Sequence, residues 1–144
     1  MIKKEKLIGP SISPIAYTGQ NKNQYGLSGF IKNPTRITKT WGYELIYQNH
    51  NLYCCKVLHI EKNNSCSYHL HMEKHETLLV IKGTLTINTT YNKQHETYHV
   101  KEGEAFVVAP GFIHSLKAES ESVTIVETST SSYDTDSIRI KEGK

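Results

Sequence analysis

Short runs of alternating apolar and polar residues, separated by turn-forming residues, constrain the fold of this 144-residue chain more than any other feature. Successive side chains of a strand point to opposite faces, so this period of two indicates strands with one buried face. The runs that predict strands are 43–47, 52–60, 66–71, 77–81, 84–90, 97–100, 105–109, 114–116 and 123–128. Many short strands at even spacing predict an all-β sandwich or barrel, and a closed barrel has the advantage of leaving no open sheet edge.

The two ends of the chain differ from this middle part. Residues 1–40 contain Gly, Pro, Asn and Gln without regular alternation, and they predict an irregular N-terminal arm with one strand at 28–32. Residues 41–128 would form the barrel, and residues 129–144 a C-terminal tail that begins as a Ser-, Thr- and Asp-rich loop. A chain of this length holds one core, so we expect a single domain.

The composition and charge pattern argue against several classes of protein. The net charge is +3, but the basic residues are scattered among acidic ones, whereas nucleic-acid binders cluster them. No apolar run approaches the roughly 20 residues of a membrane helix, and the first residues lack the apolar segment of a secretory signal. Three cysteines, two of them adjacent, make no disulfide framework. We expect a cytoplasmic protein that binds neither nucleic acid nor membrane.

A cluster of metal-ligand residue types lies in the middle of the chain. His69 and His71 are two apart on a predicted strand, so both imidazoles point to one face. Glu76 follows across a short turn, and His114 begins a later strand. Three imidazoles and one carboxylate suit Mn, Fe, Co, Ni, Cu or Zn and leave open positions on the ion. The expected cofactor is a divalent transition metal (Zn, Mn, Fe, Ni or Co).

These residues carry a resemblance to a known family. His69, His71, Glu76 and Gly83 match the first motif of the cupin superfamily, HxH(x)3-4E(x)6G, and Gly103, Gly111 and His114 follow its second motif, G(x)5PxGxxH. Three positions depart from the family pattern without removing a ligand, namely Asn63, Pro110 and Ala118. The resemblance implies a small metal cupin, with a double-stranded β-helix, or jelly-roll, barrel.

Further segments resemble one branch of that superfamily. Residues 41–44, 56–60, 127–130 and 136–140 are similar to the sugar-phosphate cupins, which include the type II phosphomannose isomerase domain. The closing segment of that branch carries a second arginine, which is missing here. The resemblance implies a sugar, sugar phosphate or nucleotide sugar as the small-molecule substrate. Because cupins commonly dimerise, it also implies a homodimer.

Three residues outside the ligand set are candidates for catalysis. Glu127 shares the apolar face of its strand, so it would be a general base if it faces the metal, or a solvated residue if it sits in solvent at the strand end. Lys56 interrupts an apolar strand and would bind a substrate anion, pair with Glu127, or point outward. Arg139 is one of two arginines, and its guanidinium suits phosphate or carboxylate, although a surface role is the alternative.

Three functions are compatible with these residues. The leading hypothesis is a metal-dependent sugar isomerase or epimerase, in which the metal stabilises an enediolate while a base removes the neighbouring proton. A mononuclear non-haem iron dioxygenase could use the same ligands. A non-enzymatic cupin that binds a sugar without converting it is the other alternative. The fold alone cannot choose among them, because the same fold hosts all three classes.

Overall fold

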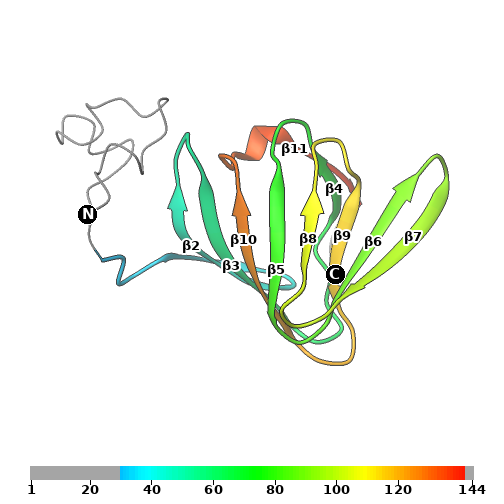
Figure 1. Cartoon of the computed structure of the whole chain (residues 1–144), viewed down its shortest axis with the longest axis horizontal. Coiled ribbons are helices and arrows are strands. Elements are labelled where there is room, and N and C mark those ends of the chain that lie inside the picture. The colour runs from blue at the N-terminus through cyan, green and yellow to red at the C-terminus, as the bar shows by residue number, and fades with distance from the viewer. Residues whose placement is uncertain (1–29, 142–144) are drawn as a thin grey trace, which may run out of the picture. The chain divides into compact units, whose positions relative to one another are not determined.

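The structure is a computed structural model, and it describes residues 30–141. All of the strands described below lie in one unit of the chain, which begins at residue 33. Within the described part of that unit, two antiparallel sheets pack face to face around one core (Figure 1).

Strand order in each sheet is that of a jelly roll, because strands distant in the sequence are neighbours. The six-stranded sheet consists, in order, of β1 (Thr35–Lys39), β2 (Gly42–Asn49), β3 (Cys54–Ile60), β10 (Val123–Ser129), β5 (Glu76–Lys82) and β8 (Ala105–Val108). The five-stranded sheet consists of β11 (Ser137–Lys141), β4 (Tyr68–His71), β9 (His114–Ala118), β6 (Leu85–Tyr91) and β7 (Gln94–Val100). A short 3₁₀ helix, η2 (Asp134–Asp136), precedes β11.

The all-β prediction is confirmed, and each predicted strand from 43–47 to 123–128 corresponds to a strand from β2 to β10. The first strand differs from the prediction. Residues 30–32 are not a strand, residues 28–29 lie outside the described residues, and β1 lies within the range expected for the irregular arm. All five residues of β1 are exposed, so this edge strand has no alternation of burial to reveal it and is held by its backbone pairing with β2.

The barrel interior is lined by the inward residues of both sheets. In β3 the burial alternates residue by residue, and the inward row contains Leu58 and Ile60. The inward rows of β5 and β10 contain four completely buried side chains, Leu78, Val80, Val123 and Ile125. They pack against Leu85, Ile87 and Leu116 of the opposite sheet in one hydrophobic cluster.

Two turn positions have a left-handed backbone conformation, which explains the residue types found there. Asn63 stands where cupins have a leading glycine ahead of the histidine pair, and its φ of 65° is a conformation that glycine favours and asparagine tolerates. Gly83 has a φ of 83°, and a Cβ atom there would lie 2.5 Å from the carbonyl oxygen of Ser122. The first motif therefore needs glycine at this position for both backbone and space.

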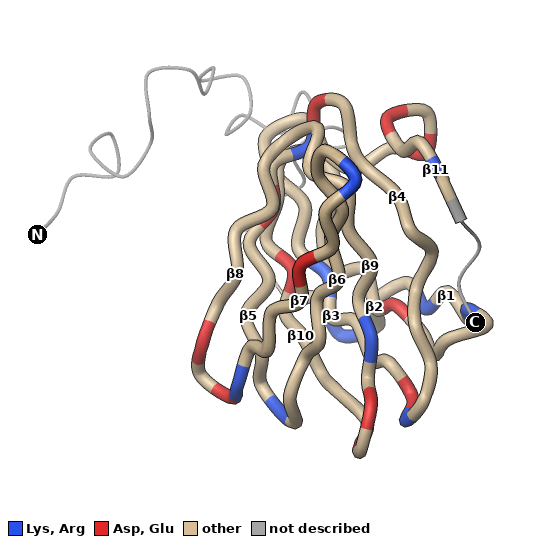
Figure 2. The backbone as a smooth tube through the Cα atoms, turned by 90° about the vertical axis from the view of Figure 1, so that its right-hand side faces the viewer, with Lys and Arg blue, Asp and Glu red and all other residues tan. Residues whose placement is uncertain are grey.

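Lys and Arg positions are interspersed with Asp and Glu positions along the described backbone (Figure 2). Residues 30–141 contain no helix of the length and apolar character needed to span a membrane.

Candidate metal centre and its cavity

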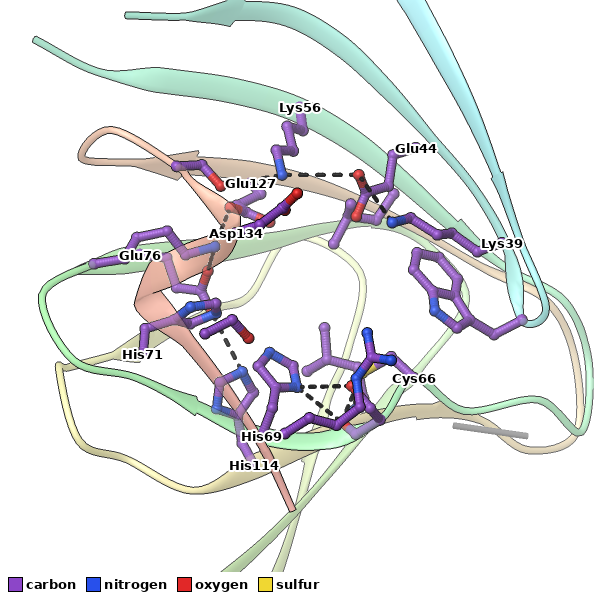
Figure 3. A pocket seen from close by; sticks show the side chains of 18 of the residues that line it. Lys39, Glu44, Lys56, Cys66, His69, His71, Glu76, His114, Glu127 and Asp134 are labelled. Atoms are coloured by element: carbon purple, nitrogen blue, oxygen red, sulfur yellow. Dashed lines mark hydrogen bonds and ion pairs between the residues drawn. The ribbon is translucent and has the colours of Figure 1, made fainter. Parts of the chain in front are cut away.

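Three histidines from two adjacent strands meet inside one end of the barrel. His69 and His71 lie on β4, and His114 begins β9 directly opposite His69 in the strand register. One nitrogen from each ring lies within 4.8 Å of the others, and the rings converge on one point (Figure 3). His71 and His114 are buried and His69 is half-buried. The strand spacing and the second motif thus bring together three of the four residues proposed as ligands, and Glu76 is not part of this group.

Hydrogen bonds orient two of the rings as metal ligands. Nδ1 of His69 donates to the backbone oxygen of Ser67 at 2.8 Å, and Nδ1 of His114 donates to that of Phe112 at 2.9 Å. A proton on Nδ1 leaves Nε2 with a lone pair, which is the tautomer of a metal-binding histidine.

The surroundings of the His114 Nε2 atom indicate whether a metal ion fits this site. It is buried and makes no hydrogen bond, although Glu76 Oε1 lies 3.3 Å away in a poorly aligned position. A buried nitrogen with an unused lone pair is costly unless a ligand or ion satisfies it. The donor set and this unsatisfied atom both fit a divalent transition metal held by His69, His71 and His114.

His69 and His71 are uncharged at neutral pH, as metal ligands must be. Burial, assisted by His114, lowers the pKa of His69 to about 4. Burial and the positive charge of Lys74 lower the pKa of His71 to about 4 as well.

Glu76, the predicted carboxylate ligand, borders the histidine cluster. Its side chain is 3% exposed, and its Oε2 atom lies 2.7 Å from Nζ of Lys74. Burial alone would raise the pKa of Glu76, but contacts with His114 and Lys74 outweigh burial and hold that pKa well below its usual range. Glu76 is therefore an ionised carboxylate beside the three imidazoles.

Lys74 is the residue that the sequence interpretation missed. It lies in the turn between β4 and β5, yet it is only 5% exposed, and its ammonium bridges Glu76 at 2.7 Å and Glu127 at 2.9 Å. Burial would lower the pKa of Lys74, but the two carboxylates outweigh it and raise that pKa. A turn has no alternation, so no periodic signal in the sequence placed this side chain inside.

Glu127 and Lys56 face the cavity from neighbouring strands and are opposite each other in the register of β10 and β3. Glu127 is 4% exposed, so of the two alternatives left open by the sequence, the one with Glu127 in solvent at the strand end is wrong. Burial and the nearby Glu76 carboxylate raise the pKa of Glu127, and Lys74 and Lys56 limit that rise. Nζ of Lys56 contacts Glu44 at 3.8 Å and donates to Ser132 at 3.3 Å rather than pairing with Glu127.

All of these groups line one cavity of about 510 Å³. Arg139, on β11, is exposed and also lines the cavity. It therefore lies at the surface, as one alternative had it, and still borders the site. Trp41, Leu58 and Leu116 supply apolar wall. The size lies in the range of sites for small organic molecules, and the wall offers a few fixed polar groups on an apolar background.

Residues 31–141 match the family model described as Cupin. The chain belongs to the cupin family, as the two motifs predicted.

Solved structures of similar fold include the capsular polysaccharide assembling protein CapF from Staphylococcus aureus, at 15% identity and a TM-score of 0.69 over 78% of this chain and 33% of that one. CapF with the inhibitor 3-isopropenyl-tropolone matches at 16% identity and a TM-score of 0.69, over 81% and 37%. Oxalate decarboxylase from Bacillus subtilis matches at 13% identity and a TM-score of 0.66, over 78% of this chain and 33% of that one. This chain thus spans about a third of the length of these proteins, and the likeness concerns the fold. A search of curated proteins found no similar sequence.

Proposed function

We propose that this cupin is a metal-dependent enzyme that isomerises or epimerises a sugar, sugar phosphate or nucleotide sugar. One observation carries the proposal: a buried carboxylate, Glu127, lies in the same cavity as the cluster of three histidines and is tied through Lys74 to Glu76. A binding module needs no buried, pKa-raised carboxylate beside its ion, whereas proton transfer at carbon does.

His69, His71 and His114 would hold the metal, with Glu76 as the fourth protein ligand. A divalent ion bound there supplies Lewis acidity toward two neighbouring oxygens of an open-chain sugar. The remaining work, removal and return of a proton, falls to residues of the chain.

Glu127 is the proposed base. Lys74 and Ser129 both donate to its Oε1 atom, at 2.9 and 3.4 Å, and this fixes the carboxylate while leaving Oε2 to take the proton. The raised pKa of Glu127 suits a group that must accept a proton from one carbon and return it to the next.

Lys56 and Arg139 are proposed to bind an anionic group of the substrate. The Lys56 ammonium is nearly buried and lies at 3.8 Å from Glu44, a long contact that a phosphate or carboxylate could replace. Arg139, at the rim, can approach the same group from the other sheet. The fold neighbour CapF, named as a capsular polysaccharide assembling protein, is consistent with a carbohydrate substrate.

The test is exchange of the C2 proton for deuterium in D₂O, followed by NMR, with metal-loaded protein and a panel of hexose phosphates and nucleotide sugars. We expect exchange with at least one substrate and a loss of about 100-fold or more in the Glu127→Gln variant, because a positioned base contributes about that much. The control is Glu121→Gln, an exposed residue in the turn before the same strand. Exchange with no substrate, or full activity in Glu127→Gln, would overturn the proposal. A sugar that binds and is recovered unchanged would assign the non-enzymatic alternative.

A further inference from the structure

A buried carboxylate lies directly behind the turn that joins two of the metal-ligand residues. Asp136 is the last residue of η2 and is only 4% exposed, although aspartate is rarely buried without partners. It belongs to the C-terminal segment, which returns to pair with the ligand strand β4 through β11. The sequence resemblance included Asp136 but gave it no role.

Three successive backbone amides of that turn donate to Asp136. Met72 N–H donates to its backbone oxygen at 3.0 Å, Glu73 N–H to Oδ1 at 2.7 Å, and Lys74 N–H to Oδ2 at 2.9 Å. The turn runs from His71 to Glu76, so one residue accepts three of the backbone amides between these two ligand positions. Charge-assisted bonds to backbone amides are among the stronger hydrogen bonds in proteins.

The same carboxylate faces an imidazole of the cluster. Oδ2 of Asp136 lies 3.9 Å from Nδ1 of His71, whereas the Nδ1 atoms of His69 and His114 already donate to backbone oxygens. Metal-binding histidines almost always donate their other ring N–H to an acceptor, and a carboxylate is the strongest such acceptor. The 3.9 Å separation is longer than a hydrogen bond, so Asp136 would complete the set of acceptors behind the three rings once the His71 ring shifts toward it.

We propose that Asp136 is a positioning residue of the metal centre, which fixes the 72–74 turn and accepts the ring N–H of His71. The inference rests on the metal-binding part of the proposed function and does not depend on the reaction. Asn in place of Asp136 keeps the shape but presents an NH₂ group to amide or ring donors. The substitution therefore removes one acceptor without opening a cavity.

The first test is the zinc affinity of Asp136→Asn, measured by competition with a chelating dye on otherwise intact protein. We expect the affinity to fall by about 10- to 100-fold, the usual effect of losing an outer-shell partner. The matched control is Thr130→Val. Thr130 Oγ1 accepts His75 N–H at 3.2 Å, so it holds the same turn without any contact to a ring of the cluster. We expect this variant to bind zinc within about twofold of the wild type, as independent sites do.

A second measurement needs no variant. In zinc-loaded wild-type protein, the Nδ1 proton of His71 should be protected from solvent exchange. Its NMR resonance should lie downfield of the corresponding protons of His69 and His114, because its acceptor is a carboxylate. This keeps the proposal testable if Asp136→Asn fails to fold.

The outcomes separate the two proposals. Wild-type protein that binds zinc, with equal affinity in Asp136→Asn, overturns the role of Asp136 and leaves the proposed function standing. A loss of stability without a loss of affinity, or a rapidly exchanging His71 proton, also overturns it. Wild-type protein that binds no metal overturns both proposals.

Discussion

The two ends of the barrel interior have opposite chemistry although the same strands line both. On β10 the inward residues Val123 and Ile125 are apolar, and the next one, Glu127, is charged. On β5 the order is reversed along the chain, from Glu76 to Leu78. Because the strands are antiparallel, the charged residues fall at one end and the apolar ones at the other.

Along each strand, the change from apolar to charged side chains occurs between one inward residue and the next. In the register of the six-stranded sheet, Glu127 lies between Lys56 and Leu78, and Ile125 lies between Leu58 and Val80. Alternation decides which face a residue occupies, whereas position along the strand decides whether it belongs to the core or to the site. We expect stability to come from the apolar end and metal chemistry from the polar end.

Lys74→Met should produce the largest change in stability. It tests whether the Lys74 ammonium stabilises the two buried carboxylates at the polar end of the barrel. The substitution leaves Glu76 and Glu127 buried without their shared cation, and breaking a buried ion pair in this way costs about 3–5 kcal/mol. Urea unfolding of metal-free protein at neutral pH measures the loss.

The double variant Lys74→Met/Glu127→Gln is the control for that prediction. It removes one of the two like charges, so it should recover part of the lost free energy of unfolding. A Lys74→Met variant as stable as the wild type would show that the ammonium does not hold the two carboxylates together.

Leu78→Ala tests the other end of the barrel. Leu78 is completely buried one inward step from Glu76, and truncating such a leucine costs about 2–5 kcal/mol because it leaves a cavity. Zinc affinity should stay within about twofold of wild type, because Leu78 supplies no ligand and holds no ring. Urea unfolding and zinc titration of the same sample measure both. A large loss of zinc affinity would show that the two ends are coupled.

Acidification should also lower the free energy of unfolding, by less than either substitution does. In the unfolded chain a histidine has its ordinary pKa of about 6.5, whereas the folded pKa of His69 and of His71 is about 4. Between these values the unfolded chain binds protons that the folded protein does not, so stability of the metal-free protein falls as pH falls from about 6.5 to about 4. Above pH 6.5 these two groups contribute no pH dependence.

The urea midpoint measured across that pH range, in wild type and in His71→Gln, checks the prediction. The slope should be smaller in the variant, because one of the two depressed groups is gone. Equal slopes would assign the pH dependence to other groups.

Most strands and most residues of the site could be predicted from the sequence, because alternation indicates which side chains of a strand face inward and motif spacing locates the histidines. His69 and His71 share a face by their spacing, and Glu127 follows the inward row of Val123 and Ile125. The family assignment was predicted by the same motifs and is confirmed by the match to residues 31–141. The choice of sugar, the dimer and the cellular location stay predictions.

The missed residues lie where no periodicity exists. Lys74 is in a turn and Asp136 in a single 3₁₀ turn, and each reaches the site through the tertiary fold. Hydrogen bonds between residues 72–74 and 136 join segments that are distant in the sequence, and local pattern carries no information about such contacts. Strand β1 was missed for a related reason: all of its residues are exposed, so no alternation of burial indicates a strand there.

The most direct test of the central claim is the metal content of protein purified without an affinity tag or chelator, by elemental mass spectrometry. The parallel sample is the His69→Ala/His114→Ala variant, which removes two of the three converging rings. The account predicts near-stoichiometric transition metal in the wild type and loss of that metal in the variant. Wild-type protein that contains no metal and takes up none when it is added, or a variant that retains the full amount, would contradict it.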